Sequence, residues 1–337
     1  MKWILLTAVA GICAGSFGLP MKFTTKWRWE HSWSMFALWG LIVLPCLIAI
    51  FTIPHLPAIY SNSSWTDLLL VFLFGSCWGI GTLTFGLGLS YLGIGLGYSL
   101  MVGLIIIIGS ILPMIMAANV KLLAPKCIAV MAGIAVILIS VVINSLGAVI
   151  KERDISSRAS TNQTTKKTFL KGIIICILSG IASPGLNYAF IYGNSLTQAA
   201  INSGVSSTVA ANAVLPIALM GAGILNLAYC FWLINKAKTW RIYLHKGTGF
   251  YFFFTPLMAV ETIGIALFGI ASANLGNIGP TIGWALINSV AILWANILGV
   301  FTSEWKGVSR KTWVIMVFGM ITLLIGICIV GWANSLC

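Results

Sequence analysis

Charged residues are scarce in this sequence. Only 7% of its 337 residues are Asp, Glu, Lys or Arg, and only six of them are acidic. Hydrophobic residues make up 59%, and the mean hydropathy is +1.03. These values lie outside the usual balance of a soluble globular domain. The composition therefore predicts an integral membrane protein.

Several chemical motifs are also missing. The sequence has no Walker A motif and no metal-ligand cluster, and we expect its three histidines, His31, His55 and His245, in loops. An ATP-driven pump or a membrane metalloenzyme would lack its working residues, so we expect no cofactor, no metal and no enzymatic activity. Apart from Lys171, which is the third residue of the sixth predicted span, no Lys or Arg falls inside a predicted span, where a cation would be needed to neutralise a phosphate or carboxylate. Nucleotide sugars and phosphorylated sugars are therefore disfavoured as cargo.

Long apolar runs follow one another with short polar breaks. A spanning helix needs about 20 mostly apolar residues. Ten such runs are present, and the break between the third and fourth, "SYLGIG", is marked by glycines and not by charge. The fold class predicted is an all-α membrane protein with ten transmembrane helices: Trp3–Leu19, Trp33–Phe51, Asp67–Ser90, Gly93–Ala118, Cys127–Ile150, Phe169–Tyr192, Ser206–Ile234, Phe250–Ala273, Gly279–Thr302 and Thr312–Ala333.

Basic residues are distributed unequally between the two sides. The breaks after spans one, three, five, seven and nine hold 16 of the 19 Lys and Arg residues, and the other side holds Lys2, Lys121 and Lys126. The positive-inside rule places the first side in the cytoplasm and both termini outside. The excess of positive charge thus predicts contact with the lipid bilayer and its anionic headgroups, and no nucleic-acid partner. Tryptophans at span ends, among them Trp27, Trp33 and Trp305, are interpreted as an interfacial belt.

A hydrophilic stretch divides the chain into two blocks of five spans. We predict a first repeat at 1–150, a basic cytoplasmic linker at 151–168 and a second repeat at 169–337. An odd number of spans per block requires opposite orientations in the membrane. Span three matches span eight at an offset of 183 residues, through Ile80, Gly81, Phe85, Gly86, Leu92 and Gly93 beside Ile263, Gly264, Phe268, Gly269, Leu275 and Gly276. An inverted repeat is typical of secondary transporters that work by alternating access.

Glycine and proline are frequent within the spans. Gly75 and Gly79, and then Gly93 and Gly97, have the G-x-x-x-G spacing that lets helix backbones approach closely. We interpret these pairs as packing sites and not as ligand sites.

Four stretches resemble the L-rhamnose/proton symporter family of the drug/metabolite transporter superfamily. They are "FLFGSCWGIGTLTFGLGLSYLGIGLGYSL", "SGIASPGLN", "LNLAYCFWLINKAK" and "SEWKG", and the resemblance covers most of the chain. It implies a five-plus-five inverted fold, a cavity lined by spans one to four and six to nine, and sugar uptake coupled to protons. We expect a monomer or homodimer in the inner membrane. The chain departs from the family pattern at Thr82, Phe85 and Ser90, and in "AVETIGIALFG" of span eight.

Polar and aromatic side chains within spans are the candidates for sugar binding. Amides hydrogen-bond to hydroxyl groups, and aromatic faces cover the C–H surface of a sugar. The predicted set is Trp78, Thr82, Tyr98, Asn187, Tyr188, Asn212, Asn226, Trp284 and Asn288. For each asparagine the alternative is a hydrogen bond between helices.

Glu261 is the one acidic residue placed well inside a span. The offset of 183 residues gives Trp78 as its counterpart in the first half. Loss of hydration in this position disfavours the charged carboxylate, so that the group can load and release a proton. We predict that Glu261 couples transport to protons; the alternative is a permanently protonated side chain bonded to a neighbouring helix.

Two other functions are compatible with parts of this pattern. An exporter of cationic or zwitterionic metabolites would use Glu261 as the partner of its cation. A membrane enzyme acting on lipid-linked sugars would need a second acid or a base near Glu261, and the other five acids fall in loops or at span ends.

Overall fold

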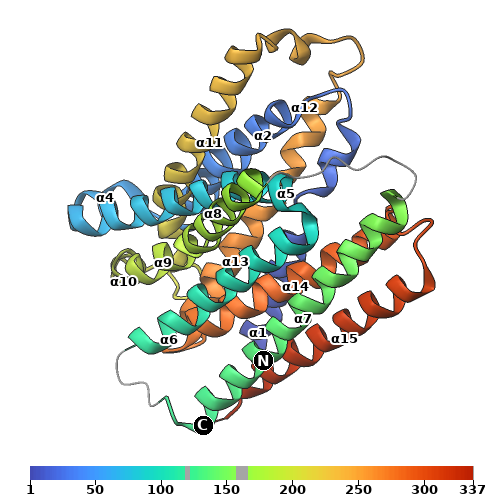
Figure 1. Ribbon diagram of the computed structural model, residues 1–337. Coiled ribbons are helices and arrows are strands. Elements are labelled where there is room, and N and C mark those ends of the chain that lie inside the picture. Colours follow the sequence, from blue (N-terminus) through green and yellow to red (C-terminus); the bar gives the residue numbers. More distant parts are fainter. Residues whose placement is uncertain (118–121, 157–165, 337) are drawn as a thin grey trace. The chain divides into compact units, whose positions relative to one another are not determined.

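The computed structural model describes residues 1–117, 122–156 and 166–336. Within these ranges all regular secondary structure is helical (Figure 1). Ten segments are long and apolar enough to cross a membrane, which confirms the predicted all-α fold with ten spans. They are Lys2–Phe23, Trp29–Thr52, Trp65–Leu89, Leu96–Met116, Pro125–Lys151, Phe169–Asn202, Ala210–Ala237, Tyr251–Asn274, Gly279–Phe301 and Arg310–Ala333. The central part of the predicted linker, 157–165, lies outside the described residues.

Two compact units are formed, and each takes spans from both halves of the sequence. Unit 1 comprises Met1–Ile80 and Gly185–Gly276. Its helices are α1 (Lys2–Ser16), η1 (Leu19–Phe23), α2 (Trp29–Leu38), η2 (Trp39–Val43), α3 (Leu44–Thr52), α4 (Leu56–Ser61), the first part of α5 (Trp65–Ile106), α9 (Gly185–Tyr192), α10 (Asn194–Asn202), η4 (Ala210–Val214), α11 (Leu215–Ala237), η5 (Trp240–Leu244), α12 (Tyr251–Phe254), η6 (Thr255–Ala259) and α13 (Val260–Asn274).

Unit 2 comprises Gly81–Pro184 and Asn277–Cys337. It holds the rest of α5, then η3 (Ile107–Ile111), α6 (Leu112–Met116), α7 (Pro125–Ser156), α8 (Lys166–Ala182), α14 (Gly279–Phe301) and α15 (Arg310–Ala333). In Figure 1, α7 and α15 lie side by side.

Prolines interrupt the regular helix in several spans. A proline lacks the N–H that bonds to the carbonyl four residues earlier, and its ring crowds that carbonyl. The π-helical turns η2 and η3 end two residues before Pro45 and Pro113, and the 3₁₀ turn η6 contains Pro256. Such irregular turns often mark hinges or functional sites inside a helix.

Glycines of α5 make close helix contacts in unit 1. A Cβ atom at Gly75 would lie 1.9 Å from the carbonyl oxygen of Ala218, and one at Gly79 would lie 2.6 Å from Cα of Ala222. The contacting residues are therefore four positions apart on both α5 and α11. The predicted packing role of this G-x-x-x-G pair is confirmed.

The chain reverses direction within α5, in the stretch where the glycine-marked break was predicted. A Cβ atom at Gly97 would lie 3.2 Å from the carbonyl oxygen of Gly88, and the rings of Phe85 and Tyr98 are 5.9 Å apart. In a straight helix these pairs would be separated by about 14 and 20 Å. Spans three and four are thus two separate crossings, as predicted.

The longest uninterrupted helix pair is α7 with α15 in unit 2. A Cβ atom at Gly133 would meet Val330, and one at Gly147 would meet Met316, so that the contacts advance in opposite directions along the two helices. Glycines of α15 contribute in the same way, because Gly326 faces Ile137. The hydroxyl of Ser140 also donates to the carbonyl oxygen of Gly319 at 3.0 Å.

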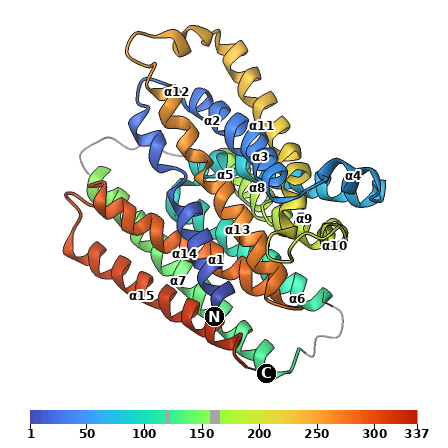
Figure 2. The same ribbon diagram turned by 180° about the vertical axis from the view of Figure 1, so that it is seen from behind.

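Two glycines separated by the 183-residue offset make similar contacts in their own units. In unit 1, a Cβ atom at Gly264 would lie 2.7 Å from the carbonyl oxygen of Ala10 in α1. In unit 2, a Cβ atom at Gly81 would lie 2.5 Å from Oγ of Ser183, just after α8. Figure 2 shows α1 and α13 side by side. Span eight therefore packs on span one much as span three packs on span six.

Two expectations about span ends were wrong, one of them only in part. Trp27, Trp33 and Trp305 are only 5–7% exposed and pack inside the protein, whereas Trp65 and Trp240, at other span ends, are 76% and 43% exposed. His31 does not lie in a loop; it belongs to the first turn of α2 and is fully buried. In both cases the helix ends pack against other span ends and their connecting segments, which the sequence pattern alone does not show.

Candidate transport site

Glu261 lies in the first turn of α13, directly after the 3₁₀ turn η6. Its side chain is half-buried, near the middle of the Tyr251–Asn274 span. Among the acids placed in described spans, Glu30 and Asp67 occupy the first turn of their spans, so Glu261 alone is far from an end. The structure thus keeps the position that the sequence predicted.

The helix around Glu261 is irregular, because the 3₁₀ turn η6 passes into the α-helix α13 directly before this residue. The apolar surroundings of a span disfavour a charged carboxylate. Irregular turns inside helices often mark functional sites. The location therefore suits a carboxyl group that changes its protonation state.

The start of α13 is fixed to two other spans of unit 1. The hydroxyl of Thr262, next to Glu261, donates to the carbonyl oxygen of Gly40 in the π-helical turn η2. Three residues after Glu261, Gly264 packs against Ala10 and Cys13 of α1. Glu261 therefore lies where three spans meet, beside the irregular turns of two of them.

Asn226 of α11 holds helices of unit 1 together. Its Oδ1 accepts a 2.7 Å hydrogen bond from Nε1 of Trp33, and its Nδ2 donates to the carbonyl oxygens of Ala222 at 2.8 Å and Gly79 at 3.3 Å. The side chain is fully buried. A sugar could bind to this amide only if some of these bonds were released.

Asn212 has hydrogen-bonding capacity left. It lies in η4, 3% exposed, and its Nδ2 donates to Oγ1 of Thr52 at 3.1 Å. Its Oδ1 is buried and has no hydrogen-bond partner among the residues that the structure describes. A buried carbonyl oxygen of this kind is costly unless another group supplies a donor.

Asn187 and Tyr188 lie on α9, close to Trp78 of α5. Gly185 brings the two helices together, since a Cβ atom there would lie 2.9 Å from the backbone nitrogen of Trp78. All three side chains are buried, and Tyr188 packs beside Phe74 with ring centroids 5.6 Å apart. Gly185 thus brings α9 and Trp78 together, and Asn212, Asn226 and Glu261 lie elsewhere in the same unit.

The remaining four candidates belong to unit 2. Nε1 of Trp284 donates to the carbonyl oxygen of Ile105 at 3.0 Å, next to the π-helical turn η3, and Nδ2 of Asn288 donates to the carbonyl oxygen of Trp284. Tyr98 packs edge-on against Phe85. Thr82 lies on α5, one residue beyond Gly81.

A buried polar group at the start of α2 was missed by the sequence interpretation. Glu30 is 5% exposed and pairs with Nε of Arg28 at 2.8 Å, and Nε2 of His31 lies 3.0 Å from the carbonyl oxygen of Thr239. The hydroxyls of Ser34 and Tyr243 are 2.6 Å apart. The signal was available in "WRWEHSWS", where ionisable and aromatic residues mix at the edge of an apolar run.

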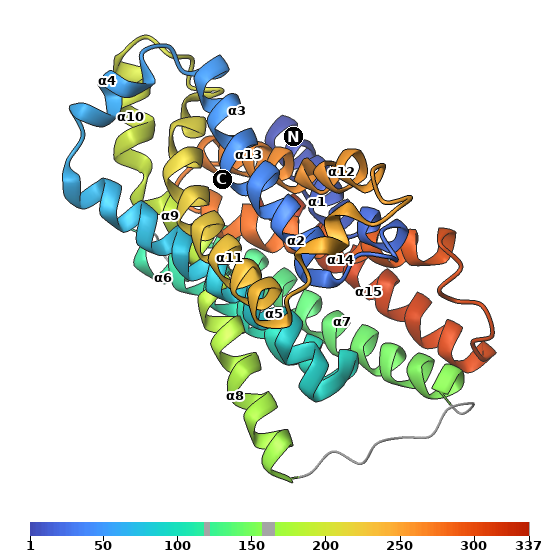
Figure 3. The same cartoon turned by 90° about the horizontal axis from the view of Figure 1, so that it is seen from above.

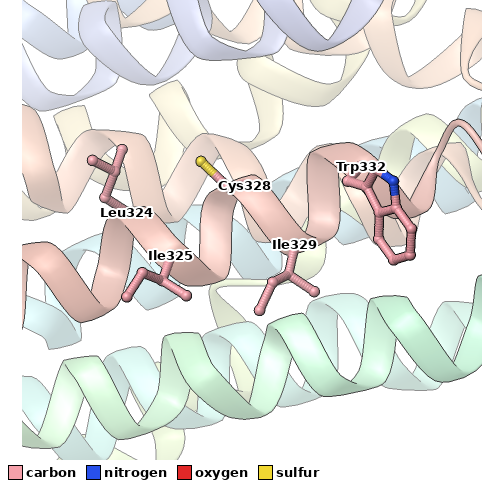
Figure 4. A pocket seen from close by; sticks show the side chains of 5 residues that line it. All are labelled: Leu324, Ile325, Cys328, Ile329 and Trp332. Atoms are coloured by element: carbon pink, nitrogen blue, oxygen red, sulfur yellow. The ribbon is translucent and has the colours of Figure 1, made fainter.

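Other features of the described chain do not resemble a sugar or metal site. No group of three His, Cys, Asp or Glu residues could hold a metal ion within the described ranges. A groove on α15 is lined by Leu324, Ile325, Cys328, Ile329 and Trp332 (Figure 4). Its lining is almost wholly carbon, which suits lipid chains better than a sugar.

Comparison with known proteins identifies the family. The family model described as L-rhamnose-proton symport protein matches residues 1–335. The chain belongs to this family. It is 28% identical over 341 residues to the L-rhamnose-proton symporter of Yersinia pestis bv. Antiqua (strain Antiqua), covering 98% of this chain and 96% of that protein. The symporter of Yersinia pseudotuberculosis serotype O:1b (strain IP 31758) is also 28% identical, over 342 residues, with the same coverage.

Membership in the L-rhamnose-proton symport family makes the chain a multi-pass membrane transporter and not an enzyme. The lipid-linked sugar enzyme considered from the sequence is therefore excluded. The alternative of a cation exporter is not favoured, because the match to sugar symporters extends over nearly the whole chain.

Proposed function

We propose that this protein imports a neutral monosaccharide, L-rhamnose or a similar deoxyhexose, together with protons by alternating access. The family match and the names of the Yersinia relatives support the sugar and the coupling ion. The single observation that carries the mechanism is the position of Glu261 near the middle of span eight, next to the 3₁₀ turn η6. The proposed location is the bacterial inner membrane, with both termini outside.

Glu261 is assigned the role of proton carrier. With the cavity open to the outside, the carboxyl group takes up a proton and the sugar binds. The carrier then changes its conformation only when proton and sugar are both bound or both absent. The proton gradient therefore drives uphill transport of the sugar. The hydrogen bond from Thr262 to Gly40 connects the helix that carries Glu261 to the π-helical turn of span two. A movement of this helix when Glu261 gains or loses a proton would therefore act directly on span two.

The sugar is assigned first to the residues with hydrogen-bonding capacity. Asn212 has a buried oxygen that would accept a bond from a sugar hydroxyl, and Asn187, Tyr188 and Trp78 supply a buried amide and two aromatic rings. Thr82, Tyr98, Trp284 and Asn288 are secondary candidates. Asn226 is assigned mainly to holding helices together, since its amide is already engaged.

An inverted five-plus-five repeat is part of the proposal. It is supported by the similar packing of Gly81 and Gly264, and by the antiparallel pairing of α7 with α15, the fifth span of each predicted half. A pair of related helices that cross in opposite directions is what a two-fold axis in the membrane plane would produce.

The test uses purified protein in proteoliposomes with labelled L-rhamnose and an inward proton gradient. We expect Glu261→Gln to abolish accumulation, since the amide cannot titrate, while exchange of sugar at equal pH continues. Glu304→Gln, at the end of a span, is the matched control and should accumulate sugar normally. Uphill accumulation by Glu261→Gln with unchanged pH dependence would remove Glu261 from the mechanism. Transport of amines and not of sugars by the wild type would refute the proposed cargo.

A further inference from the structure

The helices α2 and α11 of unit 1 pack against each other (Figure 3). A cluster of polar and aromatic side chains lies where α2 begins and α11 ends. We call Trp27, His31, Ser34, Thr239 and Tyr243 the His31 cluster. Tyr243 is its centre: its ring lies 4.7 Å from the ring of His31 and 5.2 Å from that of Trp27, and its hydroxyl is 2.6 Å from Oγ of Ser34. The cluster connects α2 with the segment that follows α11.

His31 has one ring nitrogen available for a proton. Its ring is fully buried, and Nε2 lies 3.0 Å from the carbonyl oxygen of Thr239. A carbonyl oxygen only accepts hydrogen bonds, so Nε2 must carry a hydrogen, and the neutral ring then has its lone pair on Nδ1. That atom is buried and has no hydrogen-bond partner among the described residues.

Two further polar atoms of the cluster share this condition. Nε1 of Trp27 and Oγ1 of Thr239 are buried without a hydrogen-bond partner in the described chain. Buried polar groups are nearly always satisfied by protein or by water, because leaving them unpaired is costly. A donor, an acceptor and a hydroxyl around one tyrosine are the groups that could hold water and exchange protons with it.

The charges around His31 are few and mostly engaged. Glu30, on the same turn, pairs with Arg28. Tyr243 faces the ring from η5, and burial raises the pKa of its phenol, which keeps the hydroxyl protonated. Cys230 of α11 is fully buried and interacts electrostatically with Tyr243. His31 is therefore the member of the cluster that has a basic nitrogen, Nδ1, with an unused lone pair.

We infer that His31 is a second proton-carrying residue of the symport cycle. It exchanges the proton between the transport pathway and water at the end of unit 1 that carries Lys26, Arg28, Lys236 and Lys238. The inference rests on the proposed function. The proton adds to Nδ1 while Nε2 keeps its own hydrogen and its bond to Thr239, and the same proton later leaves from Nδ1 to water. No other bond is made or broken. By the proposed topology this end faces the cytoplasm, so His31 serves proton release.

The test measures sugar-driven proton entry into proteoliposomes that contain a pH-sensitive dye. In His31→Gln the amide can still donate to the carbonyl of Thr239 but cannot take a proton. We expect the maximal rate of proton entry to fall about tenfold and to lose its dependence on internal pH, because the amide has no basic nitrogen. Sugar exchange at equal pH should continue at the wild-type rate. His245→Gln, in the exposed loop beyond η5, is the matched control and should change neither quantity.

A second variant covers the case in which His31→Gln is unstable. Thr239→Val removes the unpartnered hydroxyl but keeps the carbonyl to which His31 bonds, so it should slow proton entry and shift its pH profile while exchange remains. A wild-type rate and pH profile in a folded His31→Gln, or in Thr239→Val where the first does not fold, would overturn the inference. Equal losses of exchange and proton entry would also overturn it, since they indicate a structural role. If the wild type moves no protons with sugar, the proposed function itself fails.

Discussion

The interrupted spans of unit 1 differ in construction from the α7 and α15 helices of unit 2. In unit 1, spans two, seven and eight contain irregular turns, and buried polar groups such as Asn226, Thr262 and His31 bond between elements. The α7 and α15 helices of unit 2 run without interruption and meet mainly through glycines. Irregular backbone beside polar groups allows local change, whereas interdigitated uninterrupted helices resist it. The comparison suggests that α7 and α15 act as scaffold and that the interrupted spans carry the transport chemistry.

The largest expected effect tests the scaffold role. Gly326→Leu should destabilise the protein by about 3 kcal/mol or prevent folding, because its side chain would overlap Ile137 of α7. A Cβ atom at Gly326 would already lie 2.7 Å from Cγ1 of Ile137. Thermal unfolding in detergent, followed by size-exclusion chromatography, measures the change. Gly103→Leu is the control, since no heavy atom lies within 4 Å of its Cβ position; equal behaviour of the two variants would contradict the packing argument.

The next effect separates two asparagines of unit 1. Asn226→Leu should lose about 2 kcal/mol of stability, because Nε1 of Trp33 is left buried without its acceptor. Asn212→Ala should cost less stability but raise the KM for sugar uptake, because it removes an oxygen proposed to bind the sugar. Unfolding curves and initial uptake rates of both variants provide the measurement. A normal KM for Asn212→Ala would exclude that residue from the sugar site.

A smaller effect concerns the connection between α13 and η2. Thr262→Val removes the bond to Gly40 and should reduce stability by about 1 kcal/mol. We expect proton-driven accumulation of sugar to fall by more than the loss of folded protein accounts for, because the helix that carries Glu261 is no longer bonded to span two. Thr322→Val on α15 removes only a bond to Phe318 within its own helix and is the control. Transport that falls equally in both variants would argue against a special connection.

The smallest effect lies in unit 2, where Asp154 fixes the start of α15. Its Oδ2 accepts hydrogen bonds from Oγ1 of Thr312 at 2.6 Å and from the backbone nitrogen of Ser309 at 2.9 Å. These bonds lower the pKa of the carboxyl group below its ordinary value of 3.8. A depressed pKa contributes stability above the ordinary value, and this contribution is lost as the pH falls through the folded-state pKa.

Asp154→Asn should therefore increase hydrogen exchange around 309–312 at neutral pH, and the difference from the wild type should shrink on acidification below about pH 4. A difference that is independent of pH would show that charge does not matter at this helix end.

Much of the fold followed from the sequence because hydrophobic runs and basic loops are local signals. Ten spans, the glycine-marked reversal within α5 and the tight packing at Gly75 and Gly79 were predicted and are confirmed. The position of Glu261 near the middle of its span was also evident. The buried state of His31 was not, since its burial depends on Tyr243 and Thr239, which are more than 200 residues away in the chain.

The sequence by itself determined that this chain lies in a membrane, because apolar runs of spanning length have no other stable surroundings. It also determined the family and the one acid deep within a span. Only the tertiary structure decided which polar groups are already satisfied and which are not. Asn226 and Asn212 are alike in sequence, but the oxygen and the nitrogen of the Asn226 amide both bond to neighbouring helices, whereas Asn212 keeps a buried oxygen without a partner among the described residues. Hydrogen-bond satisfaction depends on contacts between distant segments, and a local pattern carries no information about them.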